Sequence, residues 1–371
     1  NFTTISGGSV TVDQSGPASF TTGAVTAVGG TVTANYWNGT NTSLKVTVPI
    51  ANDASLEGGT LQLRANVASG GYENFGSAYT ITGDDLNGNY EFSNTAAVFE
   101  ALSGGLSDGE SVAFTAILTD KSGNSTTGTA SGTTITVDQT GPTISTSSIA
   151  SDNSTTTLAT TGDVVTLTIA TNENVTSPTV SFTSGGAAAA NNDTVAGDSP
   201  GTSFTAAYTV DAADTDGSVA ISISATDVAG NVTSGHTSIS GGSVTVDQTA
   251  PASQQVGSVV TTGGTVVANY WNSTNTGLQM QVSIANDSSL SSGSIQPLVS
   301  TNGGGSFVNL GSAVNITSID ATQTVSITAA VLEAVAGFEE SDVLQFKATL
   351  TDNAGNSTTG TASGTTITVD Q

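Results

Sequence analysis

The sequence predicts an all-β protein built as a row of β-sandwich domains, and three observations lead to this fold class. Runs in which apolar and polar residues alternate recur along the chain, which is the periodicity of strands with one buried face. Aromatic residues make up only 5% of the chain, so each core must be thin and filled by β-branched side chains. A Val-Asp-Gln motif, usually followed by a turn and a proline, recurs at the ends of such runs.

The Val-Asp-Gln motif marks the boundaries between domains. Each copy follows an alternating, β-branched run that is typical of the last strand of a sandwich. The proline after it has a fixed backbone angle and no N–H donor, so it cannot continue a central strand and marks the start of the next domain. The copies begin at Val12, Val137, Val246 and Val369.

The length of 371 residues fits about three domains. We expect residues 1–14 to be the last strand of a preceding unit, because the chain begins in the middle of the pattern. Three full immunoglobulin-like units follow, at 15–139 (type A), 140–248 (type B) and 249–371 (type A). We therefore interpret the sequence as a window of a longer polypeptide.

The two type A units are copies of one another. Both contain a strand, a polar turn and a second strand around a Tyr-Trp-Asn segment, at 31–48 and 265–282. Both also place apolar residues at helical spacing, at 95–102 and 328–335. The sequence predicts a short helix in each of these two units, and strands and loops elsewhere.

The charge and cysteine content exclude several classes of function. Thirty acidic residues against four basic ones give a net charge of −26, which repels nucleic acid and anionic lipid. No apolar run approaches the length of about 20 residues that a membrane-spanning helix needs. There is no cysteine, so divalent cations are the obvious substitute for disulfide cross-links. This composition favours an extracellular protein.

A second motif, Thr-Asp-x-x-Gly-Asn, precedes the last strand of each unit and is typical of a hairpin turn. Its copies begin at Thr119, Thr226 and Thr351, and we expect one long strand from each turn to the next Val-Asp-Gln motif. In an immunoglobulin-type sandwich this turn lies at the end where the chain enters, as does the loop between the second and third strands. The turn therefore faces the Val-Asp-Gln motif of the preceding unit.

Three carboxylates are thus predicted to meet at each junction, one from the motif, one from the loop and one from the turn. We group Asp13 with Asp53 and Asp120, Asp138 with Glu173 and Asp227, and Asp247 with Asp287 and Asp352. Three anions at close range repel one another unless they are neutralised, and oxygen ligands suit a hard cation, for which Ca²⁺ is the natural candidate. The plainer interpretation, that these residues only form turns and cap backbone groups, stays open.

Together, the turn and the Val-Asp-Gln-Thr-Ala-Pro motif resemble the bacterial Ig-like (Big-type) tandem repeats of very large cell-surface adhesins, including type I secreted, RTX and biofilm-associated ones. The resemblance covers essentially the whole chain and is most typical in residues 140–248. It implies an extended stalk on the bacterial surface, with Ca²⁺ at the linkers and with neighbouring repeats as partners. It therefore implies a non-enzymatic structural extender of an adhesin.

Two other functions fit the sequence. An unpaired strand at residues 1–14 invites pairing with another copy, as in a filament or surface layer. Trp37 and Trp271 could stack on surface glycans, although a place in the core is the plainer interpretation of both. The single histidine, His236, has no Ser or Cys nucleophile motif beside it, so the sequence predicts no enzyme.

Overall fold

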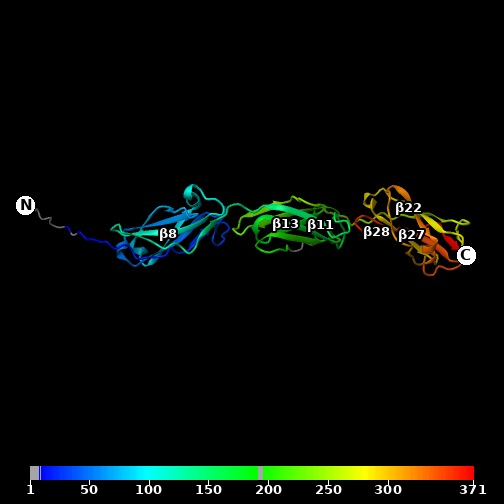
Figure 1. The fold of residues 1–371 in the computed structure, drawn as a ribbon, viewed down its shortest axis with the longest axis horizontal. Coiled ribbons are helices and arrows are strands. Elements are labelled where there is room, and N and C mark those ends of the chain that lie inside the picture. The colour runs from blue at the N-terminus through cyan, green and yellow to red at the C-terminus, as the bar shows by residue number, and fades with distance from the viewer. Residues whose placement is uncertain (1–7, 9, 191–194) are drawn as a thin grey trace, which may run out of the picture.

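The computed structural model of the protein describes residues 8, 10–190 and 195–371. Three β-sandwiches follow one another in an elongated row, as the blue-to-cyan, green and yellow-to-red parts of Figure 1 show. We call them A1, B and A2, in chain order, with the bounds given above. Each has its own hydrophobic core, and the three cores share no residue.

Each domain consists of two sheets. In A1 the smaller sheet contains β1 (Val25–Val28), β3 (Ser43–Ile50) and β7 (Gly88–Thr95). The larger sheet of A1 contains β2 (Tyr36–Trp37), β4 (Thr60–Val67), β5 (Tyr72–Asn74), β6 (Tyr79–Thr80), β8 (Ser111–Thr119), β9 (Ser125–Thr127) and β10 (Ile135–Val137).

Domain B has the same plan with fewer strands. Its smaller sheet contains β11 (Ile144–Ser151), β13 (Val164–Val175) and β16 (Gly201–Thr209). Its larger sheet contains β12 (Leu158–Ala159), β14 (Thr179–Ser184), β15 (Ala187–Ala188), β17 (Gly217–Thr226), β18 (Val232–His236) and β19 (Thr245–Val246).

Domain A2 repeats A1. Its smaller sheet contains β20 (Val256–Thr262), β22 (Gly277–Ile284) and β26 (Ala321–Thr328). Its larger sheet contains β21 (Tyr270–Trp271), β23 (Ser294–Ser300), β24 (Val308–Asn309), β25 (Val314–Asn315), β27 (Val343–Thr351), β28 (Ser357–Thr359) and β29 (Ile367–Val369).

The strand order is that of an immunoglobulin-like sandwich. The first strand is divided between the sheets: in A1, β1 pairs antiparallel with β3, whereas β2 pairs parallel with β10. The same division recurs at β12 with β19 and at β21 with β29. Alternation of buried and less buried residues, as in β3 and β4, gives such strands one face in the core. The predicted fold class is therefore confirmed.

Short helices lie where the spacing of apolar residues predicted them. The α-helices are α1 (Ala96–Glu100) and α2 (Ala329–Glu333), one in each A domain. The 3₁₀ helices are η1 (Ala54–Leu56), η2 (Gly83–Asp85), η3 (Leu102–Gly104) and η4 (Ser288–Leu290). Of these, η1, η2 and η4 lie where the sequence predicted only strands and loops. Phe99 of α1 packs on Trp37 with ring centroids 4.7 Å apart, so the helix closes one end of the A1 core.

The structure differs from the sequence predictions for two strands. The predicted long last strand is wrong, because it is split into β9 and β10 in A1 and likewise in the other domains. Between β9 and β10 the chain contacts the segment that enters the domain. The ring of Phe20 fills the space beside Gly128, and Ser131 Oγ donates a hydrogen bond to the carbonyl oxygen of Gly23 (2.7 Å). The strand predicted at residues 1–14 lies largely outside the described residues, and its described part, residues 8 and 10–14, belongs to no strand.

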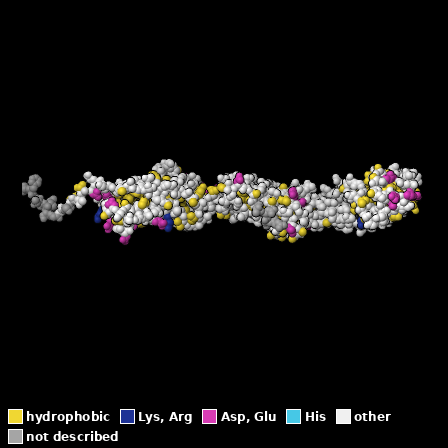
Figure 2. Space-filling view, turned by 90° about the horizontal axis from the view of Figure 1, so that it is seen from below, with side chains coloured by type: hydrophobic (Ala, Val, Ile, Leu, Met, Phe, Trp, Pro, Cys, Tyr) yellow, Lys and Arg dark blue, Asp and Glu magenta, His cyan; other side chains and the backbone are white. Residues whose placement is uncertain are grey.

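On the face drawn in Figure 2, most atoms belong to the backbone or to side chains that are neither charged nor hydrophobic. Figure 2 shows one long face on which acidic side chains are scattered and basic ones are few. One of the basic side chains, Lys45, pairs with Glu91 (Nζ to Oε1, 2.6 Å). No helix among the described residues is both long and apolar enough to cross a membrane.

Candidate functional site: the junctions between domains

The Asp-x-x-Gly-Asn turn of each domain is held in shape by its own aspartate. In domain B, Asp227 Oδ1 accepts hydrogen bonds from the backbone N–H groups of Ala229 (2.8 Å) and Asn231 (2.9 Å). Gly230 adopts φ +94°, a conformation that side-chain-bearing residues rarely take. Asp120 and Asp352 make the same pair of bonds in A1 and A2. The turn is therefore a rigid element in all three domains.

At the junction between A1 and B this turn is inserted into the end of A1. Asn38 Nδ2 donates to the carbonyl oxygen of Ala229 (2.7 Å), and Asn231 Nδ2 donates to the carbonyl oxygen of Asp138 (2.9 Å). Gly39 N donates to Asn231 Oδ1 at the longer distance of 3.4 Å. Asn38 and Ala229 are fully buried, so the bond between them forms away from competing water.

The fit of the turn leaves no room at Gly230. A Cβ atom on this residue would lie 2.7 Å from Thr31 Cγ2 and 3.0 Å from Thr33 Oγ1 of domain A1. The backbone of the turn thus packs directly on the loop that precedes β2. A side chain here would push the two domains apart.

The junction between B and A2 uses the same arrangement with different residues from the preceding domain. Asn153 Nδ2 donates to the carbonyl oxygen of Ala354 (2.9 Å), and Thr160 Oγ1 donates to Asn356 Oδ1 (2.6 Å). Asn356 Nδ2 donates to the carbonyl oxygen of Asp247 (2.9 Å). Ala354 is 1% exposed. The turn therefore docks on both a type A and a type B domain.

A carboxylate also binds the linker at each junction. Asp108, in the loop before β8, accepts from Gln139 N (2.7 Å) and from the Thr140 hydroxyl. Asp216, in the loop before β17, accepts from Gln248 N (2.8 Å) and from Thr249 Oγ1 (2.6 Å) in the same way. The linker has few free torsions left, because its backbone and side chain are bonded to the domain it leaves.

The Tyr-Trp-Asn segment and the short helix of the A domains act together on the linker. Trp37 is buried and donates its indole N–H to Glu100 Oε1 of α1 (3.2 Å). The same oxygen accepts from Gln139 Nε2 of the linker (2.7 Å). A2 repeats the set with Trp271, Glu333 and Gln371. The helix thus connects the core of each A domain to its linker.

Three carboxylates meet at the junction between A1 and B. One oxygen each of Asp138, Glu173 and Asp227 lies within 4.8 Å of the others, and this is the only such group of potential metal ligands among the described residues. Asp138 and Glu173 border an open hollow of about 420 Å³, which is also lined by Asp108 and Asn172. Asp138 belongs to A1 and the other two to B, so the group bridges the domains.

The surroundings of this cluster disfavour its charged form. Burial raises the pKa of Asp138 above its ordinary value, and the negative charges of Asp227 and Asp108 raise it further. Burial likewise raises the pKa of Glu173, followed by the charges of Asp138 and Asp227. Each raised pKa means that a nearby positive charge would stabilise the cluster.

The other predicted groups do not gather in this way. Asp53 and Asp287 cap η1 and η4, each accepting from a serine N–H two residues further on (2.9 Å in both). Asp13 and Asp247 accept from the backbone N–H groups of Ser15 and Thr249 (3.1 Å in both). The carboxylates of these groups thus have the turn-forming roles of the plainer interpretation.

Two of these carboxyl groups nevertheless have shifted pKa values. Burial raises the pKa of Asp247, and the charge of Asp352 adds to the effect. The side-chain amide of Asn124 lowers the pKa of Asp120, because it donates to Asp120 Oδ2 (3.0 Å). The charge of one carboxylate thus raises the pKa of another at the B–A2 junction, although its three acidic residues do not form a cluster.

Sequence reasoning missed the residues of the preceding domain that receive the turn, Asn38 and Asn153, and the linker-binding Asp108 and Asp216. Both aspartates are followed by a glycine, at 108–109 and 216–217, which is a turn signal in the sequence at the approach to β8 and β17. Nothing in the sequence near Asn38 indicates its role, because its hydrogen-bond partner, the carbonyl oxygen of Ala229, lies in the next domain.

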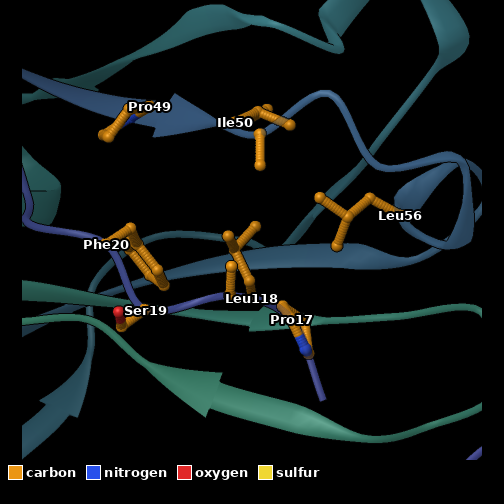
Figure 3. Close-up of a pocket in the computed structure, with 9 residues that line it drawn as sticks. Pro17, Ser19, Phe20, Pro49, Ile50, Leu56 and Leu118 are labelled. Atoms are coloured by element: carbon orange, nitrogen blue, oxygen red, sulfur yellow. The ribbon is translucent and has the colours of Figure 1, made fainter. Parts of the chain in front are cut away.

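Other candidate sites carry little chemistry. The glycan-binding interpretation of Trp37 and Trp271 is wrong, because both side chains are 0% exposed and offer sugars no face. His236 Nε2 lies 3.0 Å from the carbonyl oxygen of Ser238. A cavity of about 270 Å³ in A1 is lined by no titratable group. Its lining side chains include Phe20, Ile50 and Leu118 (Figure 3).

No model of a known protein family and no curated protein matches the sequence. Among solved structures the chain is similar to a run of consecutive titin domains (12% identity, 93% of this chain and 97% of that chain, TM-score 0.31). A second titin segment matches at 11% identity over 91% and 96% of the two chains, with a TM-score of 0.35. The tetra-tandem repeat in the extending region of a large adhesion protein matches at 16% identity over 94% and 74%, with a TM-score of 0.27.

Proposed function

We propose that this protein is a non-enzymatic structural extender of a bacterial cell-surface adhesin, in which locked junctions hold the domains in line and Ca²⁺ stiffens the junction between A1 and B. The observation that carries this proposal is the repeated junction. The same turn makes equivalent hydrogen bonds to Asn38 of a type A domain and to Asn153 of a type B domain. Buried, fully paired polar contacts fix orientation, which suits a protein whose task is to span distance.

The cluster of Asp138, Glu173 and Asp227 fits a calcium ion. Ca²⁺ takes six to eight oxygen ligands, and carboxylates are its usual protein ligands. Burial and mutual repulsion raise the pKa of two of the three groups, and a divalent cation would relieve both effects. Extracellular modules bind Ca²⁺ with dissociation constants of about 10⁻⁴ to 10⁻³ M, which matches a protein outside the cell.

Calcium at the other two predicted groups requires a rearrangement. Asp53 and Asp287 would have to move towards the other carboxylates of their groups, because only Asp138, Glu173 and Asp227 have oxygens within 4.8 Å of one another among the described residues. A movement that also broke the helix cap would cost about 1 kcal/mol. We therefore place the first calcium site at the junction between A1 and B.

The test is small-angle X-ray scattering of the whole protein with calcium and with a chelator. The proposal predicts a rod-like profile in calcium and a shorter mean end-to-end distance after chelation, because the A1–B junction then bends. Glu173→Gln should behave in calcium as the parent protein does in chelator. Identical profiles in all three cases would refute the calcium part, and a profile typical of independent domains in calcium would refute the extender itself.

A subunit of a filament or surface layer is the second candidate. It is favoured by Val10 and Val12, which are 90% and 76% exposed on the segment before A1. Light scattering should then show polymers that grow with protein concentration and disappear when residues 1–14 are deleted. A monomer at every concentration would leave the extender as the function.

A further inference from the structure

The far end of A2 carries the same loop that receives domain B at the end of A1. We call residues 31–41 of A1 and residues 265–275 of A2 the receptor loops. In A1 the loop is held by Asn38 N, which donates to Asn41 Oδ1 (2.8 Å). In A2 the corresponding bond runs from Asn272 N to Asn275 Oδ1 (2.9 Å). The bend before β2 or β21 is also identical, with φ +66° at both Asn35 and Asn269.

The receptor loop of A2 is thus formed although no domain among the described residues covers it. Asn38 Nδ2 donates to Thr31 O (2.7 Å) and to Ala229 O of domain B (2.7 Å). Among the described residues, Asn272 Nδ2 donates only to Thr265 O (2.9 Å), so one amide hydrogen is left without an acceptor. Asn38 is fully buried, whereas Asn272 is half-buried.

The surface around Asn272 is apolar and open. Val266, Val267 and Tyr270 are 55%, 45% and 43% exposed. Val267 stands where A1 has Thr33, the residue against which the turn glycine of domain B packs. Asp370 N donates to Trp271 O (2.8 Å), so Asp370 stands where Asp138 stands at the occupied junction.

We infer that this end of A2 is a docking surface for the Asp-x-Ala-Gly-Asn turn of a type B domain joined after Gln371. The inference rests on the proposed extender function and names the partner of this surface. Such a domain would place the counterpart of its Ala229 carbonyl at Asn272 Nδ2. It would also bring the counterparts of Glu173 and Asp227 to Asp370, which would form a second three-carboxylate group.

A second copy of the chain fits this surface less well. The turns at 227–231 and 352–356 are already docked within the molecule, which leaves the turn of A1 at 120–124. The side-chain amide of Asn124 lies beside the carbonyl oxygens of Asp13 (3.3 Å) and Ser15 (3.4 Å). The segment before A1 thus occupies the place where the end of the receiving domain belongs.

The experiment uses the whole chain extended by a second copy of residues 140–248 after Gln371. Gly39 N donates to Asn231 Oδ1, whereas Ser273 N, the equivalent group of A2, has no acceptor among the described residues. Amide hydrogen exchange of Ser273 should slow at least tenfold in the extended chain, and Gly39 serves as the internal reference. Asn272→Ala, or Ala229→Glu in the added copy alone, should restore fast exchange at Ser273.

The outcomes separate this inference from the proposed function. Fast exchange at Ser273 together with slow exchange at Gly39, in a chain whose added domain is folded, would overturn the inference and leave the extender intact. Fast exchange at both would count against the locked junctions themselves. In the unextended protein, exchange at Ser273 that becomes slower as the protein concentration rises would show that a second copy is the occupant. This result would also overturn the inference.

Discussion

Both junctions are held by the same inserted Asp-x-x-Gly-Asn turn. They differ in the segment between the second and third strands of the following domain. In domain B, Glu173 lies in β13, and its carboxylate joins Asp138 and Asp227. In A2 the loop between the corresponding strands forms η4, and Asp287 caps it by accepting from the N–H (2.9 Å) and hydroxyl (2.7 Å) of Ser289. The same place in the fold thus holds an available ligand in one domain and a helix cap in the other.

This difference separates two contributions to a junction. The inserted turn makes hydrogen bonds at both junctions that involve no ion. The carboxylate cluster is confined to the A1–B junction, so cations and pH should act mainly there. Each of the following experiments compares the two junctions on this basis.

The largest effect should come from the asparagine of the turn. Asn231 is 7% exposed and bonds to both Asp138 O and Asp227 Oδ2 (2.8 Å). Asn231→Ala should lower the free energy of unfolding of domain B by about 1–3 kcal/mol, because buried partners lose their hydrogen bonds. Asn356→Ala should do the same to A2. Chemical denaturation with a domain-specific probe measures both.

Asn124→Ala is the matched control, since Asn124 holds the turn of A1 but faces no folded domain among the described residues. It should cost less than Asn231→Ala, and the difference is the contribution of the junction. Equal losses of unfolding free energy in all three variants would mean that the asparagine stabilises only its own turn. The hydrogen bonds between domains would then not contribute to stability.

The next effect concerns the tryptophan, glutamate and glutamine of the A domains. Glu100→Ala leaves the buried indole N–H of Trp37 without an acceptor and frees Gln139. We expect A1 to lose about 1–2 kcal/mol of unfolding free energy. Glu333→Ala should cost A2 a similar amount. The loss of order at the following linker, measured by NMR relaxation of Gln139, should appear only in Glu100→Ala.

Calcium should act on one junction. With a dissociation constant of about 1 mM, about 10 mM Ca²⁺ stabilises the bound form by about 1.4 kcal/mol. Calorimetry should show a raised melting temperature that Glu173→Gln abolishes. Asp287→Asn should retain the calcium effect, since that residue is a cap. Equal sensitivity to both variants would contradict the assignment of the site to the A1–B junction.

The smallest effect is that of pH in the absence of divalent cations. The pKa values of Asp138 and Glu173 are raised in the folded protein, so between the ordinary carboxyl pKa of about 4 and the raised values the folded state retains protons that the unfolded state has lost. The stability from these groups is therefore present at low pH and is lost as pH rises through this window. Glu173→Gln should flatten the profile of unfolding free energy, whereas a steeper loss in this variant would refute the account.

Much of this fold could be predicted from the sequence. The alternation in runs such as β3, and the copies of the Tyr-Trp-Asn segment, were enough to predict the sandwiches and the A-B-A order. The topology of the sandwich also placed Asp138 near Glu173 and Asp227, which the structure brings together. These features depend on local periodicity and on a standard chain path.

What could not be predicted depends on contacts between domains or on competing local roles. Asn38 and Ala229 are 191 residues apart, and no periodicity encodes how one domain meets the next. For Asp53 and Asp287 the sequence left capping open as the plainer alternative to metal binding; each has a serine two residues later, which is a helix N-cap signal that Glu173 lacks. That signal would have separated the capping carboxylates from the available one.

The most direct test of the locked junctions is a distance distribution between spin labels on neighbouring domains. The chain has no cysteine, so labels can be placed on the exposed faces of the smaller sheets without background, with Ser93→Cys and Thr168→Cys across A1–B, and Thr168→Cys and Ser326→Cys across B–A2. In calcium we predict one narrow distance at each junction, and after chelation a broader distribution at A1–B alone. Broad distributions at both junctions in calcium would contradict the account.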